Sequence, residues 1–175
     1  MVKHALTFFL AVILVLSATE VFSHCEVPCG IYGDKARVEE IHEHLTTIEK
    51  AMDQIKTLSA AEEKNYNQIV RWVTTKEDHA NKIQDIIYQY FMAQRVKPVP
   101  AVADEAVYQK YINELTLLHS MLVSAMKAKQ TLDAGHVKSI HDDLELFSQS
   151  YFNEARDKGK SKIKIWKKDS EKKSQ

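Results

Sequence analysis

The feature that most constrains this chain is a stripe of apolar residues that recurs every three or four positions between residues 38 and 55. Such spacing places the side chains along one side of an α-helix, with charged residues on the other side. A helix of this kind buries one face, so other parts of the chain must cover it. The stripe consists of Val38, Ile41, Leu45, Ile48, Met52 and Ile55.

Three further segments have helical spacing. The second begins near residue 60 and ends before Lys97-Pro98-Val99-Pro100, where two prolines prevent a helix from continuing. The third begins at Asp104, a favourable N-cap residue, and the fourth follows a turn at Asp133-Ala134-Gly135 and fades near Gly159. Only 4 glycines and 3 prolines in the chain also favour helix over β-structure. The sequence predicts an all-α, antiparallel four-helix bundle over residues 35–159, preceded by a short N-terminal hook over residues 24–34.

Residues 1–23 are typical of a secretory signal peptide. A polar start at Lys3 precedes an apolar run from Ala5 to Leu16, which is too short to span a bilayer. Ser23 and Val21 are small enough for the −1 and −3 positions of a cleavage site, so we expect cleavage after Ser23 and export to a periplasm or a secretory route. The alternatives are cleavage after Ala18 and an uncleaved N-terminal anchor. Removal of 23 of the 175 residues leaves 152, enough for one domain without a stable membrane span.

The charge balance bears on the partners of the chain. It has 24 basic and 24 acidic residues, so its formal net charge is zero. Proteins that bind nucleic acid need a basic face toward the phosphate backbone, and this composition therefore argues against such a partner. We interpret the lysine-rich tail, residues 160–175, as a solvated terminus, with a membrane-surface or partner-docking segment as the alternative.

Candidate metal ligands are concentrated where the expected cleavage occurs. His24 would become the N-terminal residue, and both cysteines of the chain, Cys25 and Cys29, follow within six residues. Two cysteines in an exported protein commonly form a disulfide, whereas cysteines with a histidine also suit zinc. The spacing alone leaves a disulfide, zinc and another metal open.

The amino group that cleavage would expose favours another metal. The amine of His24, the amide nitrogen of Cys25 and the thiolates of Cys25 and Cys29 form a set of two nitrogens and two sulfurs that lies naturally in a plane. Tetragonal geometry favours nickel(II) or copper(II) over zinc, and the His24 imidazole can approach as an axial fifth ligand.

Three other residues shape this segment. Pro28 fixes a turn between the cysteines, and Gly30 permits a backbone conformation that other residues resist. Tyr32 brings a phenol near the loop, where it could hydrogen-bond a small anion or supply a proton.

The pattern His24-Cys25-x-x-Pro28-Cys29-Gly30-x-Tyr32 resembles the nickel-binding hook of the nickel superoxide dismutases. Residues 67–73, followed by Lys76-Glu77, are similar to the second helix of that family, and the resemblance extends to about Tyr151. It implies an enzyme that disproportionates superoxide to oxygen and hydrogen peroxide by Ni(II)/Ni(III) cycling. It also implies a homohexamer of four-helix bundles with one nickel ion per subunit.

The resemblance assigns roles to the hook residues. His24, Cys25 and Cys29 would hold nickel, with the His24 imidazole as the axial ligand. Pro28 would carry a cis peptide bond, and Tyr32 would gate access to the metal.

Further positions correspond to residues around the metal in the family. Glu40 is placed where the family has a glutamate that orients the axial imidazole, and His79 stands where some members have an arginine. A neutral His79 would supply less positive charge there. A second gating tyrosine corresponds to Tyr88 or Tyr90, and Lys97 resembles a lysine that attracts the anion, with a solvated helix-end lysine as the alternative.

Two other functions compete with the enzyme. One is a secreted helical-bundle binding module with a Cys25–Cys29 disulfide, and the other is a non-redox metal carrier that uses the same hook. The remaining histidines indicate no second metal site. His42 and His44 lie two apart on a helix and do not face each other, and we interpret the others as packing or surface residues: His119, His136 and His141.

Overall fold

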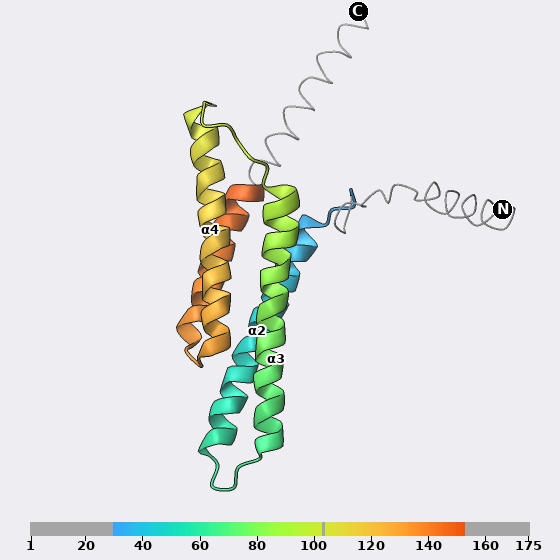
Figure 1. The fold of residues 1–175 in the computed structure, drawn as a ribbon, viewed down its shortest axis with the longest axis vertical. Helices are drawn as coiled ribbons and strands as arrows, with labels where there is room; N and C mark the ends of the chain where they lie inside the picture. Colours follow the sequence, from blue (N-terminus) through green and yellow to red (C-terminus); the bar gives the residue numbers. More distant parts are fainter. Residues whose placement is uncertain (1–29, 103, 153–175) are drawn as a thin grey trace, which may run out of the picture. The chain divides into compact units, whose positions relative to one another are not determined.

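The computed structural model describes residues 30–102 and 104–152 of the chain, which form an antiparallel bundle of helices (Figure 1). Within these ranges no β-strand occurs, and the predicted all-α four-helix bundle is confirmed. The signal peptide, hook residues 24–29 and the basic tail fall outside this part of the chain. The helices are α2 (Asp34–Ala60), α3 (Tyr66–Asp85), η1 (Ile86–Arg95), α4 (Glu105–Gln130) and a last helix over residues 134–152.

The predicted apolar stripe of α2 faces the core along its whole length, since all six of its residues are buried. The other helices contribute Ile83, Ile87, Phe91, Leu118, Met121, Ile140, Leu144 and Phe147, all fully buried. Two apolar residues within the second helical segment are on the surface: Tyr66 is 69% exposed and Val70 is 62% exposed. They lie in the first turns of α3, before that helix packs fully into the core.

The helix boundaries are set by polar caps. The second helix starts at Tyr66 and not near residue 60, because α2 continues to Ala60 and the Asn65 side chain then accepts a hydrogen bond from the Gln68 amide at 3.1 Å. The predicted cap at Asp104 is confirmed, with its carboxylate 3.0 Å from the Ala106 amide nitrogen. None of the described helices is long and apolar enough to cross a membrane.

The second helical pattern continues through a change of helix type. Residues 86–95 form the π-helix η1, in which hydrogen bonds join residues five apart. The amide of Val96 closes this segment by donating to the carbonyl of Phe91 at 2.8 Å. η1 ends at Arg95, before the two prolines that predicted this boundary.

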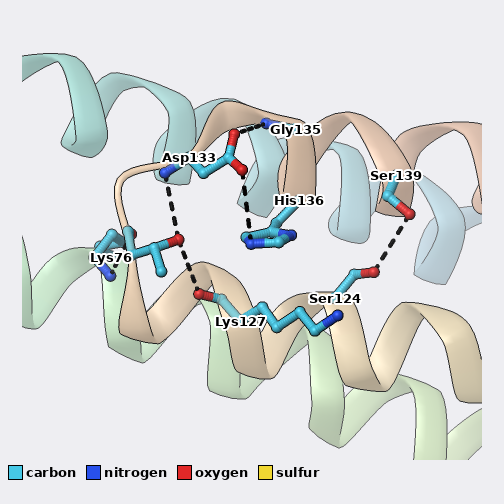
Figure 2. Close-up of polar contacts among 8 residues, drawn as sticks. Lys76, Ser124, Lys127, Asp133, Gly135, His136 and Ser139 are labelled. Carbon is cyan, nitrogen blue, oxygen red and sulfur yellow. Dashed lines mark hydrogen bonds and ion pairs between the residues drawn. The ribbon is translucent and has the colours of Figure 1, made fainter.

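The turn between α4 and the last helix is held by side chains (Figure 2). The Asp133 carboxylate accepts a hydrogen bond from the Gly135 amide at 2.8 Å and lies 3.9 Å from His136 Nε2. The last helix begins at residue 134. Gly135, which we expected in the loop between the helices, therefore belongs to the first turn of this helix. Farther along, the hydroxyls of Ser124 and Ser139 are 3.3 Å apart and join the two helices.

Lys76 of α3 is a buried cation that caps the end of α4. Its side chain is inside the bundle, with the residue only 3% exposed. The ammonium donates hydrogen bonds to the carbonyl oxygens of Ala128 at 2.7 Å, Lys129, and Thr131 at 3.4 Å. These carbonyls lie at the negative end of the α4 dipole, where a cation is favourable. Burial nevertheless lowers the pKa of Lys76.

We expect Lys76→Met to destabilise the protein by about 2–3 kcal/mol. The substitution removes hydrogen bonds from a charged donor and leaves the carbonyl oxygens at the end of α4 without the ammonium that binds them. Urea unfolding followed by circular dichroism measures this loss. Lys76→Arg, which keeps a charged donor, is the matched control and should lose less. A methionine variant as stable as the wild type would contradict the capping role.

Candidate functional site

Residues 30–33 connect the hook to α2 and contain two of the predicted site residues. Gly30 has a φ of 75°, the left-handed region that the sequence led us to expect there. Tyr32 is 43% exposed and lies two residues before the first residue of α2. The predicted ligands His24, Cys25 and Cys29, together with Pro28, fall outside the described part of the chain, so their roles stay predictions.

Asp34, the first residue of α2, is the centre of a polar cluster. Its carboxylate accepts hydrogen bonds from the phenols of Tyr90 at 2.6 Å and Tyr151 at 2.9 Å. Arg95 binds the same carboxylate with Nε at 2.8 Å and Nη2 at 2.7 Å. The cluster joins α2 to η1 and to the last helix, so it fixes the position at which the chain enters the bundle.

The electrostatics of the cluster keep Asp34 ionised. Burial opposes ionisation, but the hydrogen bonds from Arg95, Tyr90 and Tyr151 outweigh it and hold the pKa of Asp34 below its ordinary value. Burial and the hydrogen bond to Asp34 raise the pKa of Tyr90 to about 12. The hydrogen bond to Asp34 also raises the pKa of Arg95. Burial and the hydrogen bond to Asp34 likewise raise the pKa of Tyr151. The phenols of Tyr90 and Tyr151 therefore stay protonated at neutral pH and donate to the carboxylate of Asp34.

Tyr32 packs against this cluster. The Arg95 guanidinium carbon lies 4.2 Å from the centroid of the Tyr32 ring, within the range of a cation–π contact. The edge of Tyr90 meets Tyr32 at 6.0 Å between centroids and an angle of 71°. Tyr88, the other candidate for a second gating tyrosine, is partly exposed and contacts Gln89 instead. The geometry thus pairs Tyr32 with Tyr90.

Glu40 lies one step farther along α2. Its carboxylate forms an ion pair with Arg37 at 2.5 Å, and Arg37 also lies 5.5 Å from the centroid of the Tyr90 ring. Glu40 is one helical turn before His44. Arg37 and Glu40 therefore lie between Asp34 and His44 along α2.

His79 of α3 meets His44 of α2. Their Nδ1 atoms are 3.1 Å apart, so one ring donates a hydrogen bond and the other accepts it. The rings meet edge to face at 4.8 Å between centroids. His44 is buried, and its Nε2 has no hydrogen-bond partner among the described residues. Burial lowers the pKa of both histidines, and the proximity of His79 lowers that of His44 further.

We expect this pair to make the protein less stable in acid. The unfolded chain, with histidine pKa values near 6.5, binds these protons more readily than the folded protein. Stability should therefore fall as pH decreases below 6.5 and level off below the folded pKa values. The slope is at most about 1.4 kcal/mol per pH unit for each proton. Urea unfolding between pH 8 and pH 5 measures it, and His79→Gln should flatten the curve. An unchanged slope would contradict this prediction.

Lys97 is exposed and is one of the residues that line a cavity of about 280 Å³. Arg95 and Lys110 line the same cavity, together with Tyr111, Glu114 and Tyr151. The region around the predicted anion-attracting lysine is thus rich in cations, although Arg95 is paired with Asp34 and Lys110 with Glu114.

The structure adds contacts that the sequence did not predict. His44 follows the apolar stripe by helical spacing, which could have indicated that it is buried. Arg37 and Glu40 are three apart on a helix, a spacing typical of ion pairs. No sequence signal joins Asp34 to its partners, which are 56 to 117 residues away. Within the described ranges, no group of three or more His, Cys, Asp or Glu side chains could hold a metal ion.

Comparison with known proteins identifies the family. The family of nickel-containing superoxide dismutases matches residues 19–155, well over half of the chain, including the whole hook and every residue of the Asp34 and His44 clusters. No curated protein and no solved structure matches the chain significantly. The chain therefore belongs to the family of nickel-containing superoxide dismutases.

Proposed function

We propose that the chain disproportionates superoxide at its N-terminal hook, after cleavage of the Ser23–His24 bond. Family membership establishes an oxidoreductase that uses nickel and acts on superoxide. It does not say which atoms bind the metal, so this assignment is ours. Family membership and the hook motif are what carry it.

The donors in the hook fit nickel. The amine and imidazole of His24, the amide nitrogen of Cys25 and the thiolates of Cys25 and Cys29 form the nitrogen and sulfur set that a tetragonal metal prefers. Nickel, when bound, supplies one-electron chemistry between its +2 and +3 states. The net reaction converts two superoxide anions and two protons to oxygen and hydrogen peroxide.

The residues of the bundle have supporting roles in this proposal. Tyr32, which follows the hook closely in sequence, controls the approach of the anion, and its phenol can supply a proton. Tyr90 is the second tyrosine of the gate, because it is the one that contacts Tyr32. Lys97 attracts the anion, and electrostatic attraction of this kind weakens as salt is added.

The location and assembly of the protein complete the proposal. We infer that the signal peptide directs the chain out of the cytoplasm, and that the mature subunits form a homohexamer. N-terminal sequencing of protein purified from its natural compartment tests the first inference, and light scattering after size-exclusion chromatography tests the second by giving six times the subunit mass.

The N-terminal amine provides the sharpest test of the hook. We expect protein that begins at His24 to bind one nickel ion per chain and to be active. Protein with one alanine added before His24 should fold equally well but lose most of its nickel and activity, because the amine is displaced. Metal analysis and a superoxide assay on the same samples measure both. Full activity with the extension would refute the proposal, and thiol-directed mass spectrometry would reveal the alternative Cys25–Cys29 disulfide.

A further inference from the structure

We propose that Arg95 is a positioning residue for Tyr32: its guanidinium, fixed by Asp34, is the platform that holds the phenol ring in one orientation. The expected effect of Arg95 on the reaction rests on the proposed function. The contact between the two side chains can be tested without that function.

The platform is fixed from three helices. Arg95 binds both oxygens of Asp34, through Nε at 2.8 Å and Nη2 at 2.7 Å, so the plane of the guanidinium follows the plane of the carboxylate. Tyr90 and Tyr151 hold the carboxylate itself by donating to it at 2.6 Å and 2.9 Å. Arg95 therefore has little freedom to turn.

The ring that rests on this platform would otherwise be free. Tyr32 lies in an irregular segment and is partly exposed, and such a side chain normally samples several rotamers. The Arg95 guanidinium covers one face of the ring at 4.2 Å, and the edge of Tyr90 meets it at 6.0 Å. These two contacts select one ring orientation for the residue to which the proposed function gives the role of gate.

The charge of Arg95 is already balanced. Its ion pair with Asp34 cancels most of the positive field that a free guanidinium would exert on an approaching anion. Arg95 should therefore affect the reaction through the orientation of Tyr32, and not by attracting superoxide directly. Its effect should disappear when the Tyr32 ring is absent.

A double-mutant cycle with nickel-loaded protein tests this dependence. Arg95→Lys keeps a cation for Asp34 but loses the planar surface. We expect it to lower kcat/KM by about threefold to tenfold in the wild-type background, the range of a single cation–π contact, and to have no further effect in Tyr32→Leu. Equal losses in both backgrounds would mean that Arg95 acts structurally and would overturn the proposal.

Nuclear magnetic resonance tests the contact without enzyme activity. The aromatic ring should shift the Arg95 Nε–H resonance upfield, and Tyr32→Leu should abolish this shift. Tyr66→Leu, which removes an exposed tyrosine elsewhere on the bundle, is the matched control and should leave the resonance in place. An unchanged resonance in Tyr32→Leu would overturn the proposal, even if Arg95→Lys failed to fold. Inactive wild-type protein would refute the proposed function, whereas the resonance would still decide whether Arg95 holds Tyr32.

Discussion

Replacement of Cys29 by serine is expected to remove nickel from the protein and to abolish its dismutase activity, while the helical bundle stays folded. A serine hydroxyl does not replace a soft thiolate as a nickel ligand. Substitution of a residue that only hydrogen-bonds to a metal ligand already lowers metal affinity by about 10–100-fold. Loss of a ligand should therefore lower the affinity for nickel by more than about a hundredfold. Nickel per chain after dialysis and the rate of superoxide decay are the two measurements.

The same variant separates the enzyme from the competing binding module. If Cys29 formed a disulfide with Cys25, the serine variant would gain one free thiol and its nickel content would match that of the wild type. Ser59→Ala, a substitution of an exposed residue near the end of α2, is the matched control and should keep its nickel and its activity. It shows whether purification and dialysis alone remove nickel. Circular dichroism should show the same helical content for all three proteins. A serine variant with full nickel and activity would contradict the assignment of Cys29.

The substitution Phe91→Ala should destabilise the bundle by about 3–5 kcal/mol. Phe91 is fully buried, and its ring meets those of Tyr90 and Phe147 at 5.1 Å and that of Tyr151 at 5.9 Å. Truncation removes the apolar burial of the ring and leaves a cavity that these neighbours fill only in part. Urea unfolding measures the loss.

Phe91→Leu is the control for this prediction. Leucine keeps an apolar side chain in the same space and should cost much less than alanine. Because Tyr90 and Tyr151 pack on Phe91 and bind Asp34, the alanine variant should also weaken the cluster at the start of α2. A loss below about 1 kcal/mol for Phe91→Ala would show that the site collapses without a cavity and would contradict the prediction.

The repeating parts of the fold could be predicted from the sequence. An apolar stripe such as the one from Val38 to Ile55 identifies a single helix and its buried face. Its spacing is the same for any arrangement of the neighbouring helices. Asp104 could be identified as a cap because capping involves only the next few residues. The end of the second helical pattern followed in the same way from the prolines after Lys97.

The contacts between distant residues could not be predicted in this way. Nothing in the sequence around Asp34 indicates that it binds side chains from η1 and the last helix. The helical spacing shows that His44 does not face His42, but it gives no sign that its partner is His79 on another helix. Such pairs depend on the rotation of each helix about its axis, which the period of one helix does not determine.

η1 shows how strongly that rotation matters. In an ordinary α-helix, with 3.6 residues per turn, positions 90 and 95 would lie about 140° apart around the axis. In η1 the turn is wider, and both Tyr90 and Arg95 reach the carboxylate of Asp34. The length of η1 therefore determines the direction in which Tyr90 and Arg95, the residues that contact Tyr32, point from the helix axis. A single deletion within residues 86–95 would turn Arg95 away from Tyr32 without changing any residue of the hook.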